Sequence, residues 1–524
     1  MNDDSPAIHS GADHANHTSR KGTADYNAIA SAIEDGLPDR RAKAIVLAII
    51  GLPMLAMLAW AWPGYLGYDH LLTIMSIEAG QPSSHHSLLW GFLADPIIMS
   101  GSWGVGIYSL LQTSILIALD YGACMRASRA LKLSRGWTIA LAAFIGLWPA
   151  RVMYSVYVGT DPLWAALLAW SASVMLGIAS NGLQSLSRSD MGKLAVAIVF
   201  LVNLRKNGVV VVSVALLALA VIYWRKHWKR VLALLIALEL GVGAYAGLNS
   251  VAALKGIPSE PYGPALTMMV KAVMDGAKLD AGSQSVINKY GGLDKLESEW
   301  DPLDTDQLKG VVGFKGNGKE ILTVTWNVCS QKPGSCLSAW FHLMEGYLNP
   351  FMSPSRMVYE AAYGGKGYYT DFSNKPQRML DEYCMDLGCS ETLKWHFSPD
   401  NWNWRRQSLD DLQRWAQRDK TGHVVWFLFF NVSAPMWITV IAAGVAALKR
   451  RWKILALVYL PMLALIGVFL LISPIALYRY SLHVDWSVPL MVAQCLSSLR
   501  GKGNGLTDDP ATELEEDTLS ADYS

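Results

Sequence analysis

An aspartate follows closely on the first long apolar run of the sequence, and two histidines come after it. Asp69 lies about seven residues beyond this run, and His85 and His86 stand in the next polar stretch. A carboxylate at that depth is partly desolvated, so we expect its pKa to be raised, which would suit the abstraction of a proton from a hydroxyl group. The alternative is that Asp69 caps a short helix beginning at His70 and that both histidines are solvated.

Three cations and a phenol stand at the ends of later apolar runs. Arg205 and Lys206 separate two half-length runs, and Arg479 and Tyr480 lie in a short turn before the last run. An arginine binds a phosphate through two parallel hydrogen bonds, and a neighbouring tyrosine hydroxyl adds a donor. The alternative for Arg479 is snorkelling of a long side chain at the end of a span.

Asp161 is a candidate second acid. It stands in the segment GTDP, an ordinary start of a helix, but it could instead orient an acceptor or hold a divalent ion beside Asp69. Glu239 lies inside an apolar run, where a carboxylate usually faces the interior of a bundle. No glycine-rich segment carries the lysine of a P-loop, which disfavours ATP-driven transport.

The chain that positions these residues is too apolar for an aqueous protein. Of its 524 residues, 52% are apolar and 17% are charged, against about 25% charged in soluble domains. The net charge of +1 gives no basic surface for nucleic acid. About 20 apolar residues span a bilayer as a helix, and ten runs are predicted to do so: 44–62, 105–125, 137–158, 162–178, 191–204, 208–224, 231–254, 423–448, 454–473 and 482–499. The predicted fold class is an α-helical polytopic membrane protein.

Clusters of lysine and arginine predict the orientation. Such clusters precede the first run, separate the second from the third, and follow the sixth, eighth and tenth. Short basic loops stay on the cytoplasmic side during insertion. With ten spans all of these clusters share that side, so both termini are predicted to be cytoplasmic and the candidate site residues to face outward.

The spans divide the chain into five predicted parts. Residues 1–39 and 501–524 are polar tails expected to be disordered, the second of them acidic. Residues 40–254 form a membrane bundle whose first outward loop, 63–104, holds the candidate catalytic residues. Residues 255–422 form an outward domain of mixed structure between spans seven and eight, and 423–500 form the last helices.

Cysteines gather in the outward domain. Four of the six lie there: Cys329, Cys336, Cys384 and Cys389. This distribution fits two disulfides in an oxidising compartment. A zinc site is the alternative, but only the second pair has the usual spacing of two to four intervening residues.

Several segments together resemble a known family. From about residue 60 to 490 they are, in order, PGYLGYDHLL, the histidine His86 before an apolar run, GTDPLWAALL, LRKNGVVVV and YRYSLHVDWSVPL. They resemble a bacterial branch of the GT-C glycosyltransferases, which take sugar from a polyprenyl-phosphate carrier. The pattern departs at Ser87, where a proline is expected.

The resemblance implies a GT-C-like bundle in the bacterial inner membrane with a periplasmic active site. Asp69 would be the general base during inversion at the anomeric carbon, a role worth about 10² to 10⁴ in rate. The donor phosphate would be bound by Arg205, Arg479, Tyr480 and His86, with Asp161, His85 and Lys206 as secondary candidates. No cofactor is implied beyond a divalent ion that Asp161 could hold.

The predicted function is therefore transfer of a sugar from a polyprenyl-phosphate donor to a periplasmic glycan, lipid or protein, with membrane lipids as the other partners. One alternative is a secondary transporter or a flippase of a lipid-linked sugar. Such proteins usually carry internal repeats and polar groups near the midplane, and neither is evident in the sequence. Another alternative is a membrane-anchored periplasmic sensor, for which ten spans are more than an anchor needs.

Overall fold

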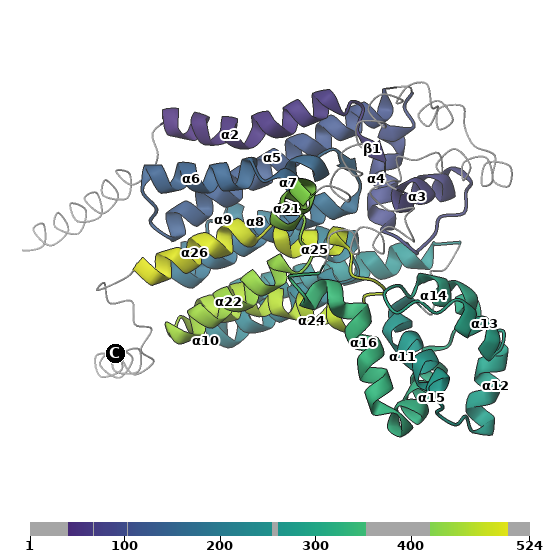
Figure 1. The fold of residues 1–524 in the computed structure, drawn as a ribbon. Helices are drawn as coiled ribbons and strands as arrows, with labels where there is room; N and C mark the ends of the chain where they lie inside the picture. Colours follow the sequence, from purple (N-terminus) through teal and green to yellow (C-terminus); the bar gives the residue numbers. More distant parts are fainter. Residues whose placement is uncertain (1–39, 67, 102, 254–259, 353–419, 501–524) are drawn as a thin grey trace, which may run out of the picture.

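The computed structural model describes residues 40–66, 68–101, 103–253, 260–352 and 420–500. Within them the chain is almost entirely helical (Figure 1). Besides the helices and the loops between them there are two short strands, β1 (Tyr65–Leu66) and β2 (Tyr157–Val158), which pair in parallel. This ribbon joins the chain just after the first long helix to the chain just before α8.

Five helical stretches of the described residues are long and apolar enough to cross a membrane. They are α2 (Arg40–Trp60), α5 (Gly104–Ala130), α8 (Thr160–Asn181), α10 (Gly208–Ser250), and the stretch Trp452–Ile472 formed by α23 (Trp452–Ile454), η5 (Leu455–Tyr459) and α24 (Leu460–Ile472). They pack side by side with the shorter α9 (Arg188–Leu204) around one apolar core. The predicted class, an α-helical membrane protein, is confirmed at this level.

The long helix α10 folds back on itself. His227 has non-helical backbone angles, φ −136° and ψ 32°. Gly208 lies against the carbonyl of Leu201, and Gly241 accepts a hydrogen bond from the side-chain amide of Asn203 at 2.9 Å, so both glycines lie beside the end of α9. In a straight helix they would be about 50 Å apart, at about 1.5 Å per residue. α10 therefore supplies two antiparallel arms, as the two separate predicted runs require.

Three of the predicted runs are broken rather than continuous, which corrects the sequence-based expectation. Run 137–158 forms α6 (Arg135–Gly146) and α7 (Pro149–Tyr154), run 423–448 forms α21 (Lys420–Phe429) and α22 (Ala434–Leu448), and run 482–499 forms α25 (Tyr478–Asp485) and α26 (Val488–Arg500). The second helix of each pair has a proline in its first two positions: Pro149, Pro435 and Pro489. Proline lacks an N–H and clashes with the preceding turn, so the earlier helix ends there.

The two ends of the bundle differ in chemistry. At one end Arg126 pairs with Asp190, and the guanidinium of Arg500 lies 3.8 Å from the centre of the Trp137 ring. These contacts join the ends of α5 and α26 to the starts of α9 and α6. We call this the basic end of the bundle, and the opposite end, where β1 and β2 pair, the site end.

Residues 260–348 form a helical lobe beside the site end (Figure 1). Its helices are α11 (Gly263–Met274), α12 (Ala281–Lys289), α13 (Leu293–Ser298), α14 (Asp306–Val312), α15 (Gly318–Gln331) and α16 (Pro333–Leu348), with the short turns η2 (Glu260–Tyr262) and η3 (Gly313–Lys315). The lobe has its own apolar core. The expected mixed structure is therefore wrong for this part, which is helical throughout its described elements.

One predicted disulfide is confirmed in the lobe. Cys329 and Cys336 are bonded, with their Cα atoms 5.7 Å apart, and they join the end of α15 to the start of α16. Cys384 and Cys389 lie outside the described residues. Cys124 and Cys495 are free thiols in the bundle.

Loss of this disulfide should destabilise the lobe. Closing the short loop between the two cysteines is worth about 2.5 kcal/mol on chain-entropy grounds. We expect the variant with Cys329→Ala and Cys336→Ala to be cleaved faster in the lobe during limited proteolysis of the full chain. The Cys495→Ala variant is the control. Equal cleavage rates in the two variants would contradict a stabilising role.

Candidate functional site

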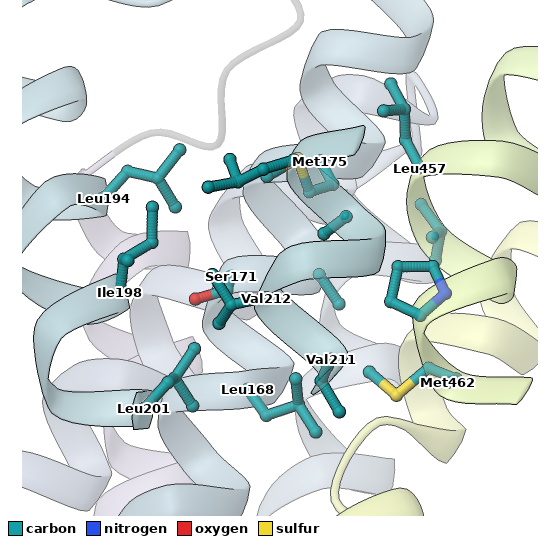
Figure 2. Close-up of a pocket in the computed structure, with 15 residues that line it drawn as sticks. Leu168, Ser171, Met175, Leu194, Ile198, Leu201, Val211, Val212, Leu457 and Met462 are labelled. Carbon is teal, nitrogen blue, oxygen red and sulfur yellow. The ribbon is translucent and has the colours of Figure 1, made fainter. Parts of the chain in front are cut away.

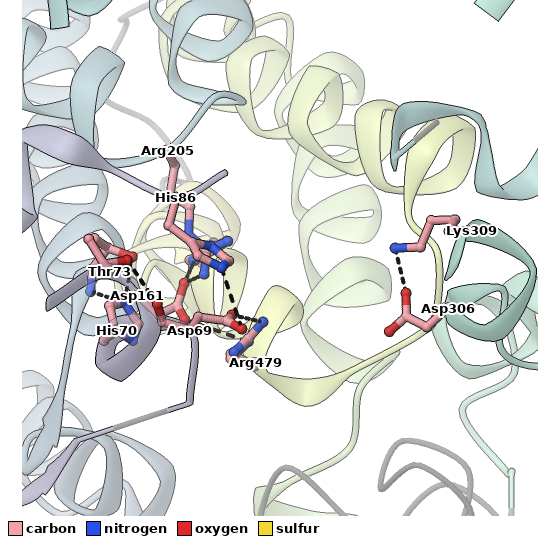
Figure 3. A network of polar contacts seen from close by, with 11 residues as sticks. Asp69, His70, Thr73, His86, Asp161, Arg205, Asp306, Lys309 and Arg479 are labelled. Carbon is pink, nitrogen blue, oxygen red and sulfur yellow. Dashed lines mark hydrogen bonds and ion pairs between the residues drawn. The ribbon is translucent and has the colours of Figure 1, made fainter. Parts of the chain in front are cut away.

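Four charged residues that are far apart in the sequence meet at the site end of the bundle (Figure 3). Asp69 lies in the first turn of α3 (Tyr68–Glu78), and Asp161 in the first turn of α8. Arg205 follows the last residue of α9, and Arg479 lies in the first turn of α25. The structure thus brings together both candidate acids and both candidate arginines.

Arg479 is the centre of this charged network. Its Nη2 lies 2.8 Å from Oδ2 of Asp69, and its Nε lies 3.6 Å from Oδ2 of Asp161. Arg205 pairs with Oδ1 of the same Asp161. The two arginines and two carboxylates balance in charge, which is what the burial of four ionised groups requires.

The network is deeply placed. Asp161 is completely buried, and Asp69 and Arg479 are only 8% and 6% exposed. Helix ends supply these residues because the chain enters or leaves the bundle there. A charged residue at the end of a helix can reach a neighbouring end without placing its backbone in lipid.

Histidines border both carboxylates. Nε2 of His86 lies 3.7 Å from Oδ1 of Asp69, and the ring of His85 packs against that of His86 at 4.4 Å between centroids. On the other side, Nε2 of His483 lies 3.2 Å from Oδ1 of Asp161. Sequence reasoning missed His483, although its position one turn after Arg479 on α25 placed it on the same helix face.

His70 is a second residue that sequence reasoning missed. Its Nε2 accepts a hydrogen bond from the backbone N–H of Thr160 at 2.8 Å, so the ring caps the first turn of α8. The ring is packed between Trp90 and Tyr157. His70 follows Asp69 and Thr160 precedes Asp161, so this one contact fixes the spacing between the two acids.

The electrostatics of Asp69 differ from the sequence-based expectation. Burial by itself would raise the pKa of Asp69, but the positive charge of Arg479 holds that pKa well below its ordinary value. The expected raised pKa is therefore wrong for this resting arrangement, in which Asp69 is a stable carboxylate. Burial lowers the pKa of His70 to about 3, which keeps its ring neutral and able to accept from Thr160.

The remaining predicted residues take different places. The Tyr480 ring lies beneath both guanidinium groups, 5.4 Å from Arg479 and 6.0 Å from Arg205, so it contributes an aromatic face. Burial lowers the pKa of Arg205 to about 10, which leaves it charged at neutral pH. Lys206 is exposed in the same turn. Glu239 is exposed on α10, contrary to the expectation that it faces the bundle interior.

Ser87, where the resemblance to the glycosyltransferases led us to expect a proline, has a structural role. Its hydroxyl oxygen accepts from the backbone N–H of Trp90 at 3.2 Å and so caps α4 (Leu88–Ile98). The same hydroxyl donates to the carbonyl of Asn203 at 2.8 Å. This contact holds the loop that carries His86 against the end of α9, two residues before Arg205.

A second buried ion pair lies deeper in the bundle. Arg151 on α7 is 3.1 Å from Oδ1 of Asp120 on α5, and both side chains are 1% exposed. Arg151 also donates to the backbone carbonyl of Trp486, where α25 ends, and the indole N–H of Trp486 donates to Asp120 at 2.8 Å. Charged residues inside predicted spans are a recognised sign of a buried network, and this one was overlooked.

An apolar cleft lies between helices of the bundle (Figure 2). It has an empty volume of about 430 Å³ and lies between α8, α9, the first arm of α10, η5 and α24. Leu168, Leu201, Val211 and Met462 are among its lining residues. Leu201, which lines the cleft, lies about one helical turn before Arg205, so one end of the cleft lies close to the cationic end of α9.

A metal role is not evident in the described residues, since no group of three or more His, Cys, Asp and Glu side chains there could hold an ion. Asp161, the predicted holder of a divalent ion, is instead in contact with Arg205, Arg479 and His483.

Fold and site together define a helical membrane protein with a buried charged network at one end of its bundle. The chain belongs to DUF6020, a family of unknown function, which matches residues 86–506. The matched range includes His86, Asp161, Arg205 and Arg479, and begins after Asp69. No curated protein and no solved structure matches the chain.

The close contact between the His70 ring and the start of α8 predicts that Gly159 does not tolerate a larger residue. A Cβ atom at Gly159 would overlap the His70 ring, whereas one at Gly177 on the same helix would meet nothing within 4 Å. We expect Gly159→Ala to destabilise the protein by about 1–3 kcal/mol through overpacking, seen as a lower midpoint in thermal unfolding in detergent. Gly177→Ala should be neutral or mildly stabilising. Equal midpoints for the two variants would refute the close approach.

Proposed function

We propose that this chain is an inverting glycosyltransferase that moves a sugar from a polyprenyl-phosphate donor to an acceptor hydroxyl. The observation that carries the proposal is the position of Arg479 between Asp69 and Asp161. A guanidinium that already binds two carboxylates can exchange one of them for a phosphate, since both anions offer oxygen pairs of similar geometry.

Donor binding would activate the base. A lipid phosphate that bonds to Arg479 competes with Asp69 for the same guanidinium. When Asp69 loses this partner while still buried, its pKa rises, because desolvation then outweighs the remaining charges. The carboxylate becomes a competent proton acceptor only in the presence of the donor, so donor binding precedes proton abstraction.

The transfer step follows from this arrangement. The acceptor hydroxyl gives its proton to Asp69 as its oxygen attacks the anomeric carbon from the face opposite the phosphate. The bond between that carbon and the phosphate oxygen breaks, and the lipid phosphate leaves with the electron pair. Arg205 and Arg479 stabilise its added negative charge. His86 lies on the outer side of Asp69 and would help to orient the acceptor or the phosphate.

The lipid part of the donor has a fitting place. The apolar cleft begins near Arg205 and runs between helices that are long enough to span a membrane. A polyprenyl chain in this cleft would place its phosphate at the charged network. This arrangement supports a carrier lipid over a soluble nucleotide sugar.

The proposal includes a topology. In this topology the membrane is crossed ten times. Five crossings are α2, α5, α8, α9 and the stretch 452–472, two are the arms of α10, and three are the helix pairs broken at proline. With this count the basic clusters favour cytoplasmic termini and a periplasmic site end in a bacterial cytoplasmic membrane. The charge pattern and the fold-back of α10 support this count.

Replacement of the base gives the first test of function. In proteoliposomes supplied with a panel of radiolabelled undecaprenyl-phosphate sugars, and with an extract of bacterial envelope lipids, glycans and proteins as the source of acceptor hydroxyls, the wild type should release undecaprenyl phosphate. Asp69→Asn should lower that rate by about 10² to 10⁴. Asp275→Asn, at an exposed lobe position, is the control. Full activity of the Asp69→Asn variant would show that Asp69 is not the general base. Failure of the wild type with every donor would refute the proposed function.

The cleft gives a separate test. Ala215 lines the cleft, and Ala215→Phe would fill it, whereas Val221→Phe on the same helix adds its ring at a position that is 79% exposed. We expect Ala215→Phe to weaken the binding of undecaprenyl phosphate, measured by thermal stabilisation, and Val221→Phe to leave it unchanged. Equal stabilisation of both variants by undecaprenyl phosphate would show that the polyprenyl chain binds outside this cleft.

One observation favours a transporter as the second candidate. The pair of Asp120 and Arg151 lies within the bundle beside two helix breaks, an arrangement found at the binding sites of secondary transporters. Movement of a labelled lipid-linked sugar between leaflets, without release of its carrier phosphate, would decide for this alternative.

A further inference from the structure

Helix α16 lies across the site end of the bundle rather than along it (Figure 1). Near its middle, the indole N–H of Trp340 donates to the carbonyl of Leu470, in the last turn of α24, at 2.8 Å. At its end, the carbonyl of Leu348 accepts from the indole N–H of Trp437, in the first turn of α22, at 2.9 Å. These contacts fix α16 at the depth where two bundle helices reach the membrane surface.

The first half of α16 extends beyond the bundle and joins the lobe. Cys336 is buried in the lobe core and is bonded to Cys329 of α15. Leu343, Met344 and Tyr347, further along α16, are buried in the core of the bundle. With 16 residues the helix is about 24 Å long. Its first turns therefore overhang the space next to α24, where lipid surrounds the bundle.

Three stripes can be distinguished on the surface of α16. Residues Cys336, Leu343 and Tyr347 form the buried stripe. About 100° further round the helix, Leu337 and Phe341 form a second stripe, and these two side chains are 54% and 50% exposed.

A third, polar stripe lies further round and carries Ser338, His342 and Glu345. Ser338 and His342 are hydrogen-bonded to each other one turn apart, which confirms that they share a face. A helix with a buried, an apolar exposed and a polar stripe has the pattern of a helix lying in a membrane interface.

The apolar stripe continues the surface of the bundle that faces lipid. Leu471, next to the carbonyl that Trp340 binds, is 71% exposed at the end of α24, and Ile472 is 38% exposed. Phe341 packs edge-to-face on Trp340 at 5.0 Å between ring centroids. Trp340 and Trp437 are the residue type that gathers at the boundary between headgroups and acyl chains.

We infer that Leu337 and Phe341 lie in the lipid leaflet at the site end, so that α16 is an interfacial helix and the lobe rests on the membrane surface. The partner of this surface is the membrane itself. Lipid contact would fix the height of the lobe above the charged network, and hence the space through which an acceptor approaches. The lipid contact itself does not depend on the transfer chemistry, whereas its effect on the acceptor rests on the proposed function.

Fluorescent labelling of adjacent positions tests this inference. In a background that retains Cys329 and Cys336 and has serine at the other four cysteines, Phe341→Cys and His342→Cys are each labelled with the fluorophore NBD. Each full-length protein is reconstituted into vesicles of phosphatidylethanolamine and phosphatidylglycerol. The quenchers are a phospholipid with a nitroxide near the headgroup end of its chain, and aqueous iodide.

We expect the label at 341 to lose most of its fluorescence to the nitroxide lipid and little to iodide, and the label at 342 to show the opposite. Two results would overturn the inference. Quenching at 341 by iodide but not by the lipid would show that the lobe stands away from the membrane. Protection at 341 from both quenchers would show that protein, from this chain or another copy, covers the stripe.

Discussion

Asp161 holds its carboxylate in a position closed to water, and this constraint governs the rest of the site. A buried carboxylate must be matched by cations and hydrogen bonds, and Arg205, Arg479 and His483 supply them. Arg205 follows α9, and Arg479 and His483 lie on α25. Their contacts with Asp161 therefore hold the end of α9 and the helix α25 at the start of α8. Removal of either arginine would cost about 3–5 kcal/mol by the measure of other broken buried pairs.

The broken helices make room for a second layer of polar contacts. Where α25 ends, the backbone carbonyl of Trp486 has no helical partner, and the guanidinium of Arg151 fills that place. Asp485 accepts from the phenol of Tyr478 at 2.9 Å and from the indole of Trp148 at 3.0 Å. The C-terminal end of the short helix that carries Arg479 is thus held against Trp148 and Arg151, and a hydrogen bond between its first and last residues spans its length.

Much of this site could be predicted because its four charged residues stand at the ends of apolar runs on one predicted side. Topology predicts that they share one face of the bundle, whereas their contacts depend on how the helices pack. The direction in which the pKa of Asp69 is shifted could not be predicted. Burial alone would raise this pKa, but Arg479, which is 410 residues away in the sequence, lowers it. His70 and His483 were equally hidden, because their contacts join distant segments. The breaks at Pro149, Pro435 and Pro489 could have been predicted from proline chemistry.

Thr305 in the lobe donates both its backbone N–H and its hydroxyl to the carbonyl of Pro474, five residues before Arg479. The linker between α24 and Arg479 is therefore clamped by a domain that contributes no charge to the network. Excision of the lobe would not yield a minimal working bundle, because the clamp would go with it. In this architecture the lobe fixes the course of the linker that leads to Arg479.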